Sequence, residues 1–496
     1  MRKPHRRSKI VCTIGPAVHS PEKIRELIEA GMDVARLNFS HGSHADHKKT
    51  IEWLRQASRE SGIEVAILGD LQGPKIRVGK VANGSIPLQA GQKLFFYGVE
   101  STHGIAPTSG TESSPIPISY PNLVTDLRQG DLLLFDDGLI RMKVTQVFSS
   151  KSVLEAEVEF GQKLGENKGV NMPKARLSGL GITEKDWEDI QFGIQEGVDF
   201  FALSFVRSYR EVKNLKGLLQ KKKSGIQVIA KIEKPEAVEN IDEILDASDG
   251  IMVARGDLGV EIGNEQVAVV QKQLIEKARL SGKPVITATQ MLMSMVENPT
   301  PSRAEASDVA NAVIDGSDAV MLSNETATGK YPIESVTMMA KIIEGAEGWL
   351  QQQPLSTFEN TRMVASSNHH PTVTEAIEIS AARLADRIGA RAIATLTRSG
   401  LSARLLAKYR PKVPILAFAE NPRVRSQLAL SWGVYVIPWE EIPSMDHTVF
   451  DDLLRELKRL GLITTTDKIV ATAGIPTSLK QGTTNTIVVK SLADSL

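Results

Sequence analysis

Short apolar runs alternate with helical patterns along most of the chain. In the stretch from Val228 to Gly259, an apolar run too short for a helix ends at Ile232, an amphipathic segment covers Pro235 to Ala247, and a second apolar run covers Ile251 to Ala254. This order is typical of a βαβ unit. Charged residues follow each of the two runs, at the end of a parallel strand that faces the ligand in α/β folds.

Eight such runs occur, and they predict eight strands. They begin at Lys9, Val34, Val65, Phe200, Val228, Ile251, Pro284 and Ala319. Helices are expected between them, for example over residues 44–61, from a capping box at Thr183, and over residues 302–315 and 332–350. Eight strands, each followed by a helix, predict a (β/α)8 barrel, an α/β fold, at residues 1–77 and 170–350. An open doubly wound sheet stays possible, because the pattern does not show closure.

The alternation breaks between residues 78 and 169. This segment is rich in Gly, Pro, Ser and Thr, carries β-prone runs such as KLFFYG and VLEAEVEF, and shows no long helical period. It predicts an inserted all-β domain. A polar linker is expected at residues 351–371, and residues 372–496 resume the alternation as a smaller C-terminal α/β domain.

Composition and charge exclude several classes of protein. A chain of 496 residues is too long for one core, and Lys+Arg and Asp+Glu balance at 59 each, so nothing favours nucleic acid or an anionic membrane as partner. No apolar stretch approaches the roughly 20 residues that span a bilayer. The one cysteine, Cys12, excludes an intramolecular disulfide and lies in an apolar run, so we expect a buried structural thiol in a cytoplasmic protein.

Polar residues gather where the predicted strands end. They are Arg36, Asn38, Ser40 and His41 after the second strand, Asp70, Lys75 and Arg77 after the third, Ser204 and Arg207 after the fourth, Lys231 and Glu233 after the fifth, Arg255 and Asp257 after the sixth, Thr289 and Gln290 after the seventh, and Ser323 and Glu325 after the eighth. Carboxylates beside a lysine and an arginine favour a divalent cation next to a bound anion. Structural ion pairs are the alternative interpretation, but core packing does not explain charges at so many strand ends.

Several motifs carry a resemblance to a known family. The runs TIGP, RLNFSHG, KIE, MVARGDLG, ATQML and VMLSNETATGKYP, in this order around an inserted β domain, resemble the pyruvate kinase family from about Lys9 to Val489. The resemblance implies transfer of the phosphoryl group of phosphoenolpyruvate to ADP, giving ATP and pyruvate in glycolysis. Two other classes stay open: another metal-dependent barrel enzyme acting on phosphoenolpyruvate or pyruvate, such as a lyase, and a catalytically silent scaffold.

The resemblance also implies roles for the matched residues. Glu233 and Asp257 match ligands of Mg²⁺ or Mn²⁺, Lys231 and Arg36 match groups that hold the transferring phosphoryl group, and Thr289 matches a residue associated with protonation of the enolate. Because threonine is a poor acid, a water chain is the expected proton donor. Substrate contacts are expected at Arg36, Lys231, Arg255, Gly256, Asp257 and Thr289, and nucleotide contacts at Arg36, Asn38, His41, Arg77 and Lys168. The β domain is expected to be a lid that excludes water.

One segment departs from the members of the family that need K⁺. Those members carry Thr, Lys and Glu in the segment written here as DLQGPKIR, whereas this chain has Leu71, Gln72 and Lys75. The counterparts of Asn38, Ser40 and Asp70 help bind the ion, and the ammonium of Lys75 would repel a monovalent cation in the region of Leu71. We therefore predict activity without K⁺; if Lys75 points to solvent instead, K⁺ binding persists.

The C-terminal segment TLTRSGLSAR joins a strand to a helix N-terminus through a loop of Ser, Thr and Gly. Thr397, Ser399, Gly400 and Ser402 are the candidate contacts for a phosphate, and an ordinary capped loop is the alternative. The loop from Thr472 to Asn485 is expected to close over this site. The resemblance implies an allosteric sugar-phosphate or nucleotide-phosphate effector here, and a homotetramer.

Overall fold

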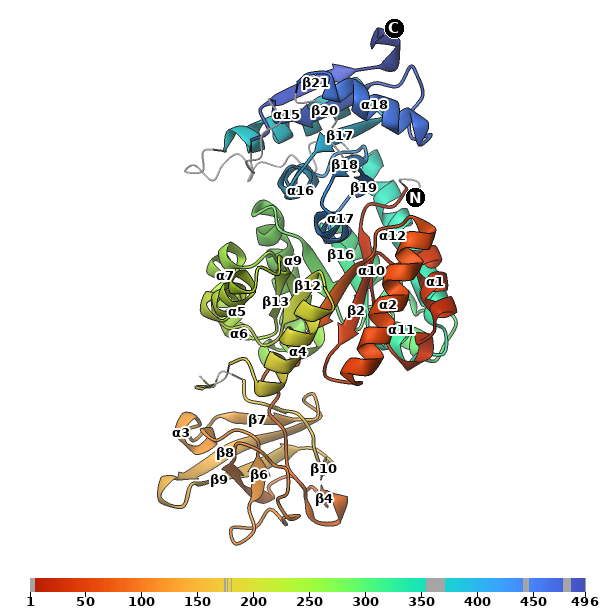
Figure 1. Cartoon of the computed structure of the whole chain (residues 1–496). Helices are drawn as coiled ribbons and strands as arrows, with labels where there is room; N and C mark the ends of the chain where they lie inside the picture. The colour runs from red at the N-terminus through yellow and green to blue at the C-terminus, as the bar shows by residue number, and fades with distance from the viewer. Residues whose placement is uncertain are drawn as a thin grey trace.

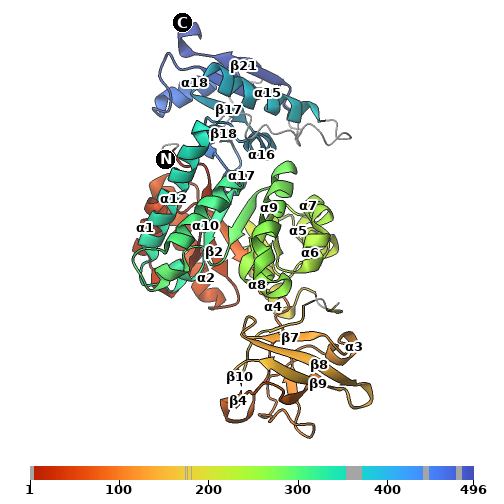
Figure 2. The same cartoon turned by 180° about the vertical axis from the view of Figure 1, so that it is seen from behind.

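Three bodies follow one another in space in the computed structural model: a β-rich body, a barrel and a C-terminal α/β body (Figure 1, and from behind in Figure 2). The structure describes residues 5–173, 175, 177–179, 181–353, 371–439, 446–475 and 483–495. Within this described part, no helix combines the length and the apolar character needed to cross a bilayer. Residues 354–370, most of the predicted linker, lie outside the described residues.

The central body is a closed barrel of eight strands in the order β1-β16-β15-β14-β13-β12-β3-β2, and every neighbouring pair is parallel. The strands are β1 (Lys9–Ile14), β2 (Val34–Asn38), β3 (Ala66–Asp70), β12 (Phe200–Leu203), β13 (Gln227–Ile232), β14 (Gly250–Ala254), β15 (Val285–Ala288) and β16 (Ala319–Leu322). The predicted (β/α)8 barrel is confirmed, and the open sheet is not formed.

Helices surround the barrel. They are α1 (Pro21–Ala30), α2 (His44–Ser61), α4 (Glu184–Gln195), α5 (Tyr209–Lys221), α6 (Pro235–Glu239), α7 (Ile241–Ala247), α8 (Arg255–Ile262), α9 (Asn264–Leu280), α10 (Arg303–Ile314), α11 (Asn324–Ala327) and α12 (Pro332–Gln352). The capping box predicted at Thr183 is present, because its side chain accepts from Asp186 N and the Asp186 side chain accepts in return. The segment predicted as one helix over 235–247 is broken at Asn240, whose side chain donates to Arg207 O at 3.0 Å.

Alternate strand residues point into the barrel or out toward the helices, as the two-residue period of a strand requires. Ile229 lies in the inner cluster, whereas Val228 and Ala230 lie in the outer one, so the next inward position on β13 is Lys231. Cys12 is fully buried in the outer cluster, as expected of a structural thiol. Apolar residues therefore fill the barrel interior, and polar side chains begin at the last inward layer.

The β-rich body is inserted after β3. Its elements are β4 (Ser85–Pro87), β5 (Lys93–Gly98), β6 (Ile116–Ile118), α3 (Leu123–Asp126), β7 (Leu132–Phe135), β8 (Ile140–Phe148), β9 (Val153–Phe160), β10 (Lys163–Gly165) and β11 (Val170–Asn171). Six of the strands form a sheet in the order β11-β7-β8-β9-β5-β6, and β10 pairs with β4. The two chain segments that connect this body to the barrel run side by side, paired by a bridge between Arg77 and Gly169.

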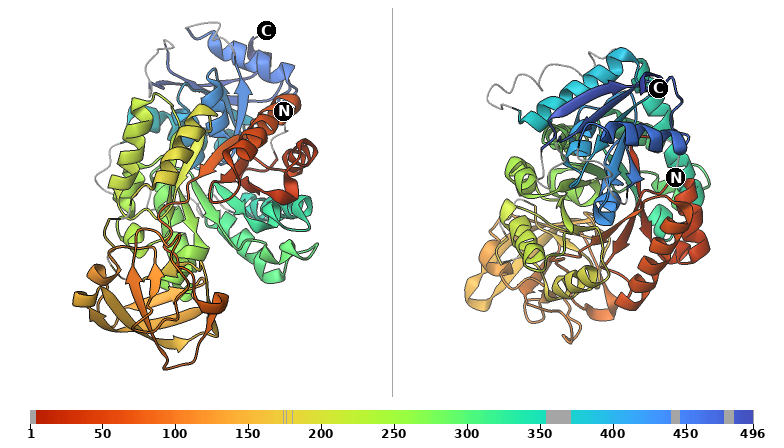
Figure 3. Two further views of the ribbon diagram at one scale, coloured as in Figure 1. Left: turned by 60° about the horizontal axis from the view of Figure 1, so that its bottom comes forward. Right: turned by 45° about the horizontal axis from the view of Figure 1, so that its top comes forward.

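The C-terminal body is a five-stranded sheet in the order β19-β18-β17-β20-β21, with β21 antiparallel. Its elements are α15 (Val373–Ile388), β17 (Ala392–Leu396), α16 (Leu401–Lys408), β18 (Ile415–Ala419), α17 (Pro422–Leu428), β19 (Val434–Pro438), α18 (Val449–Arg459), β20 (Ile469–Ala473) and β21 (Thr486–Lys490). It lies over the end of the barrel opposite the β-rich body (Figure 3). Ala429 and Leu430, which follow α17, pack into the barrel's inner cluster and close that end.

Candidate active site

The carboxyl ends of the eight parallel strands meet at one mouth of the barrel, beside the β-rich body. Lys231 lies at the centre of the polar groups there. Its Nζ is 2.9 Å from Glu233 Oε1 and 3.3 Å from Asp70 Oδ1, and it donates to Ser204 Oγ at 2.7 Å. The Lys231 side chain is 12% exposed, and the two carboxylates are almost fully buried. Three strands, β3, β12 and β13, therefore contribute to one buried charge cluster.

This cluster sets the protonation states of its members. Burial alone would lower the pKa of Lys231, but the carboxylates of Asp70 and Glu233 outweigh burial and raise that pKa above its ordinary value. Burial raises the pKa of Glu233, and the nearby carboxylate of Asp257 adds to this effect against the opposing charge of Lys231. Lys231 is therefore positively charged. The charge of Lys231 does not fully offset the effect of burial and of Asp257 on the pKa of Glu233.

Arg36 adds a second cation from β2. Its Nε donates to Asp70 Oδ2 at 2.6 Å, and its Nη1 donates to Thr13 Oγ1 at 3.0 Å. Burial raises the pKa of Asp70, but Lys231 and Arg36 outweigh burial and hold that pKa below its ordinary range. Asp70 thus stays ionised and fixes both cations at the mouth of the barrel. The involvement of Thr13 was missed in the sequence, although its place two residues after the inward-pointing Val11 would have predicted it.

Two of these carboxylates suit a divalent cation. Glu233 Oε2 accepts from Phe205 N at 2.7 Å, and Asp257 lies half-buried in the first turn of α8. In the described part of the chain, no group of three or more His, Cys, Asp or Glu side chains is arranged to hold a metal. Two carboxylates fit Mg²⁺ or Mn²⁺, which are commonly held by one or two protein carboxylates, with water and substrate oxygens as the remaining ligands.

A pocket lies between the barrel mouth and the β-rich body. Its polar lining includes Lys75, Asp137, Asn171, Arg207, Lys234, Asp257 and Glu261. Lys75 is exposed and lines the same pocket as Asp257. The side chain of Leu71 is buried and offers no ligand, and its carbonyl accepts from Ser204 Oγ at 2.7 Å.

The remaining predicted nucleotide residues come from two segments, the end of β2, where Asn38 pairs with Asp70 of β3, and the junction with the β-rich body. Arg77 Nη1 donates to Asn167 O at 3.0 Å, and Lys168 Nζ is 2.8 Å from Asp136 Oδ1, so both lie where the β-rich body joins the barrel. Asn38 Oδ1 accepts from Ser40 N at 3.2 Å just after β2. His41 is exposed, and its carbonyl contacts the ring of His47 at 2.9 Å.

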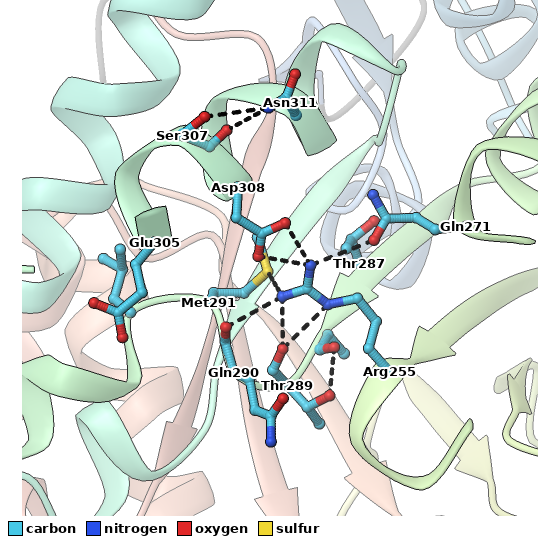
Figure 4. Close-up of polar contacts among 12 residues, drawn as sticks. Arg255, Gln271, Thr287, Thr289, Gln290, Met291, Glu305, Ser307, Asp308 and Asn311 are labelled. Atoms are coloured by element: carbon cyan, nitrogen blue, oxygen red, sulfur yellow. Dashed lines mark hydrogen bonds and ion pairs between the residues drawn. The ribbon is translucent and has the colours of Figure 1, made fainter. Parts of the chain in front are cut away.

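Thr289 and Arg255 are held together at the ends of β15 and β14. Gly256 N donates to Thr289 Oγ1 at 2.8 Å, and Thr289 Oγ1 donates to Ala288 O at 2.6 Å. The guanidinium of Arg255 contacts the carbonyl of Thr289 and the carboxylate of Asp308 (Figure 4). It therefore makes protein contacts at the position where a substrate contact was predicted.

The predicted phosphate loop lies at the start of α16. Gly400 has a φ of +79°, a conformation that glycine adopts readily, and Ser402 Oγ is 2.8 Å from Thr484 Oγ1. Thr397 lies just after β17 and is buried, and the carbonyl of Ser399 accepts from Arg404 Nη2 at 3.1 Å. Residues 476–482, part of the predicted closing loop, lie outside the described residues.

Comparison with known proteins agrees with this geometry. Residues 5–336 match the family model described as pyruvate kinase, barrel domain, and residues 375–490 match the model described as pyruvate kinase, alpha/beta domain. Pyruvate kinases of Sporosarcina psychrophila and Geobacillus stearothermophilus are 45% and 46% identical to the chain, each over 99% of it and 81% of the relative. The crystal structure of a pyruvate kinase from Cryptosporidium parvum superposes with a TM-score of 0.90 at 36% identity, covering 98% of this chain and 96% of that one. The chain belongs to the pyruvate kinase family and is a phosphotransferase of that type.

Proposed function

We propose that this chain transfers the phosphoryl group of phosphoenolpyruvate to ADP in glycolysis, using the charge cluster around Lys231. The observation that carries the proposal is a buried lysine held between two buried carboxylates at the barrel mouth, with Arg36 on the far side of Asp70. In the reaction, the bond from phosphorus to the enol oxygen breaks, and a bond from phosphorus to a β-phosphate oxygen of ADP forms. Negative charge spreads over the phosphoryl oxygens in the transition state, so fixed positive charge supplies most of the catalysis.

Lys231 and Arg36 supply that charge. Lys231 Nζ has three N–H donors, and a phosphoryl oxygen would take the place of one of its present acceptors. Nε and Nη1 of Arg36 are already bonded, whereas Nη2 makes no hydrogen bond with any described residue. The two N–H donors of Nη2 would therefore bind the phosphate in this proposal, on a planar group whose orientation Asp70 and Thr13 fix.

The charges around Lys231 also support a divalent metal. Asp70, Glu233 and Asp257 contribute three negative charges against two positive charges from Lys231 and Arg36. Mg²⁺ or Mn²⁺ held by Glu233 and Asp257 would neutralise and orient the phosphate oxygens of the substrates.

Protonation of the enolate is the second half of the reaction. Enolpyruvate accepts a proton at its terminal carbon and becomes pyruvate. A water chain donates this proton, and the Thr289 hydroxyl, which accepts from Gly256 N and donates to Ala288 O, holds that chain beside the carbon. Backbone amides at the start of α8 hold the carboxylate of the substrate.

The β-rich body, residues 78–169, acts as a lid in this proposal. Arg77 and Lys168 lie at its connection to the barrel, so closure would bring both toward a nucleotide at Asn38 and His41. Exclusion of water on closure limits hydrolysis of phosphoenolpyruvate.

The reaction in this chain is proposed to need no K⁺. Support comes from Leu71, which is buried without a polar side-chain atom, and from Lys75, which lines the same pocket as Asp257. A permanent cation on that side makes binding of a monovalent cation unfavourable.

Regulation is assigned to the C-terminal body. A sugar phosphate or nucleotide phosphate is proposed to bind at Thr397, Ser399, Gly400 and Ser402 in a cytoplasmic homotetramer. Support comes from the loop geometry at the start of α16 and from the contacts of this body with the barrel, such as Arg410 with Asp318 at 3.0 Å.

Lactate dehydrogenase coupling tests the proposed reaction. The purified chain should form pyruvate from phosphoenolpyruvate only when ADP and Mg²⁺ or Mn²⁺ are both present. A dependence on ADP separates this reaction from that of a lyase. Pyruvate formation at an equal rate without ADP would contradict the proposal.

A further inference from the structure

The loop after β15 holds two residues in an unusual backbone conformation. Thr289 has a φ of +69° and Gln290 a φ of +55°. Non-glycine residues seldom adopt this left-handed region, and a β-branched side chain such as that of threonine adopts it least readily. Such a conformation persists where the surroundings enforce it, and it occurs often at functional sites. The surroundings of Thr289 therefore need to be identified.

Arg255 provides most of these surroundings. Its Nη2 donates to Thr289 O at 2.8 Å and to Gln290 O at 3.3 Å, and its Nε donates to Thr289 O at 3.3 Å (Figure 4). The two carbonyls that receive these bonds belong to the two left-handed residues. A planar guanidinium reaches both carbonyls at once, which an ammonium on a lysine does not reproduce.

The guanidinium is itself fixed from the other side. Asp308 of α10 lies 2.7 Å from Arg255 Nη1, and Gln271 of α9 accepts from the same nitrogen at 3.4 Å. The Arg255 side chain is only 9% exposed. Its N–H donors are thus bonded to the protein.

Arg255 also reaches Thr289 through the backbone. The next amide, Gly256 N, donates to Thr289 Oγ1 at 2.8 Å. The side chain of Arg255 therefore fixes the carbonyl of Thr289, while the peptide that follows Arg255 fixes its hydroxyl. Two consecutive residues, Arg255 and Gly256, thus hold both the carbonyl and the hydroxyl of Thr289.

We propose that Arg255 is a positioning residue, which holds the left-handed turn at Thr289 and Gln290 and thereby fixes the Thr289 hydroxyl in the place where it takes part in protonation of the enolate carbon. In this role Arg255 acts through Thr289 and not through a contact with the substrate. This inference rests on the proposed function, since it concerns the proton transfer assigned there to Thr289. It replaces the substrate contact predicted for Arg255 from the sequence.

A double-mutant cycle tests the inference on the full-length chain. Arg255→Lys keeps the positive charge and removes the planar guanidinium that bonds the two carbonyls. It should lower kcat for pyruvate formation roughly 10- to 100-fold, the effect of a small displacement of a reacting group, and change KM for phosphoenolpyruvate less than about threefold. In the Thr289→Ala background the same substitution should change kcat less than about twofold, because the group it positions is absent.

Exchange of the methyl protons of pyruvate in D₂O, followed by proton NMR with Mg²⁺, isolates the proton transfer. This exchange should fall in Arg255→Lys as much as it falls in Thr289→Ala. Asp308→Asn weakens the hold on the guanidinium without changing a contact of Thr289, so it should lower both kcat and the exchange rate, each by less than Arg255→Lys does. If Arg255→Lys does not fold, Asp308→Asn takes its place in the double-mutant cycle.

Equal losses of kcat in both backgrounds would overturn the inference, as would a large rise in KM with kcat unchanged, which would indicate substrate binding. An inactive wild-type chain would instead refute the proposed function, which is a different result.

Discussion

Replacing Glu378 by glutamine should change how the stability of the chain depends on pH. Glu378 lies on α15 beside Ser402 of the predicted effector loop, and its side chain is fully buried. Its Oε1 accepts from Thr472 Oγ1 at 3.3 Å, whereas its Oε2 has no hydrogen-bond partner among the described residues. Burial raises the pKa of this carboxyl from 4.5 to about 8, and the hydroxyls of Thr472 and Ser402 offset only part of the effect.

The direction of this pH dependence follows from the protonation of Glu378 in the folded and the unfolded chain. Between pH 4.5 and about 8 the folded chain keeps a proton on Glu378 that the unfolded chain has released. Stability from this group is therefore fully present below pH 4.5 and is lost as the pH rises through about 8. At about 1.4 kcal/mol for each pH unit, the full loss is on the order of 5 kcal/mol. Glutamine is neutral throughout, so Glu378→Gln removes this dependence.

Unfolding of the wild type and the variant should be compared at pH 5, 6, 7 and 8 by urea denaturation with circular dichroism. The free energy of unfolding of Glu378→Gln relative to the wild type should rise with pH by roughly 1 kcal/mol per unit, and the variant should be the more stable protein at pH 8. Glu375→Gln is the control, because Glu375 on the same helix is paired with Lys408 at 2.7 Å and its loss should not stabilise at any pH. If the free energies of unfolding of the wild type and Glu378→Gln differ by the same amount from pH 5 to 8, the reasoning is refuted.

Four further predictions concern the barrel mouth. Lys231→Met should lower kcat at least about 10³-fold with a native circular dichroism spectrum at 25 °C. It should also lower Tm, because the buried Glu233 loses its cationic partner and Asp70 keeps only Arg36. Removing K⁺ and Na⁺ at constant ionic strength should change kcat/KM less than about tenfold, equivalent to roughly 1.4 kcal/mol, and a larger loss would contradict independence from K⁺. Lys75→Glu should create a requirement for K⁺, measured in the same coupled assay. Asp257→Asn should raise the Mg²⁺ concentration needed for half-maximal rate by about tenfold or more, whereas Asp242→Asn, at an exposed ion pair on α7, should not.

Much of the barrel was predictable because a buried parallel strand leaves a short, nearly continuous apolar run. The third strand, predicted to begin at Val65, covers Ala66 to Asp70, and the chain turns at Gly73, whose φ is +67°. The helix predicted across Asn240 is broken by a bond to Arg207, a contact between residues 33 positions apart that no local pattern contains.

The candidate site was predictable in its residues and less so in their contacts. Their place at the strand ends indicated Lys231, Glu233 and Arg36, because charged side chains at the carboxyl ends of barrel strands usually belong to the active site. The direction of Arg255 depends on Asp308, 53 positions away on a different helix, so the sequence indicated a cation without its partner. Glu378 gave no signal, since a glutamate in an amphipathic helix is ordinarily exposed and only the packing of α15 against β20 buries it.

The most direct test of the central claim is phosphorus NMR of phosphoenolpyruvate, ADP and Mg²⁺ with the purified full-length chain. The signal of phosphoenolpyruvate should be replaced by the γ-phosphate signal of ATP without K⁺, with little inorganic phosphate, and Lys231→Met should leave the spectrum unchanged over the same time. Conversion of phosphoenolpyruvate to inorganic phosphate in place of ATP, or transfer at an undiminished rate in Lys231→Met, would contradict phosphoryl transfer by the Lys231 cluster.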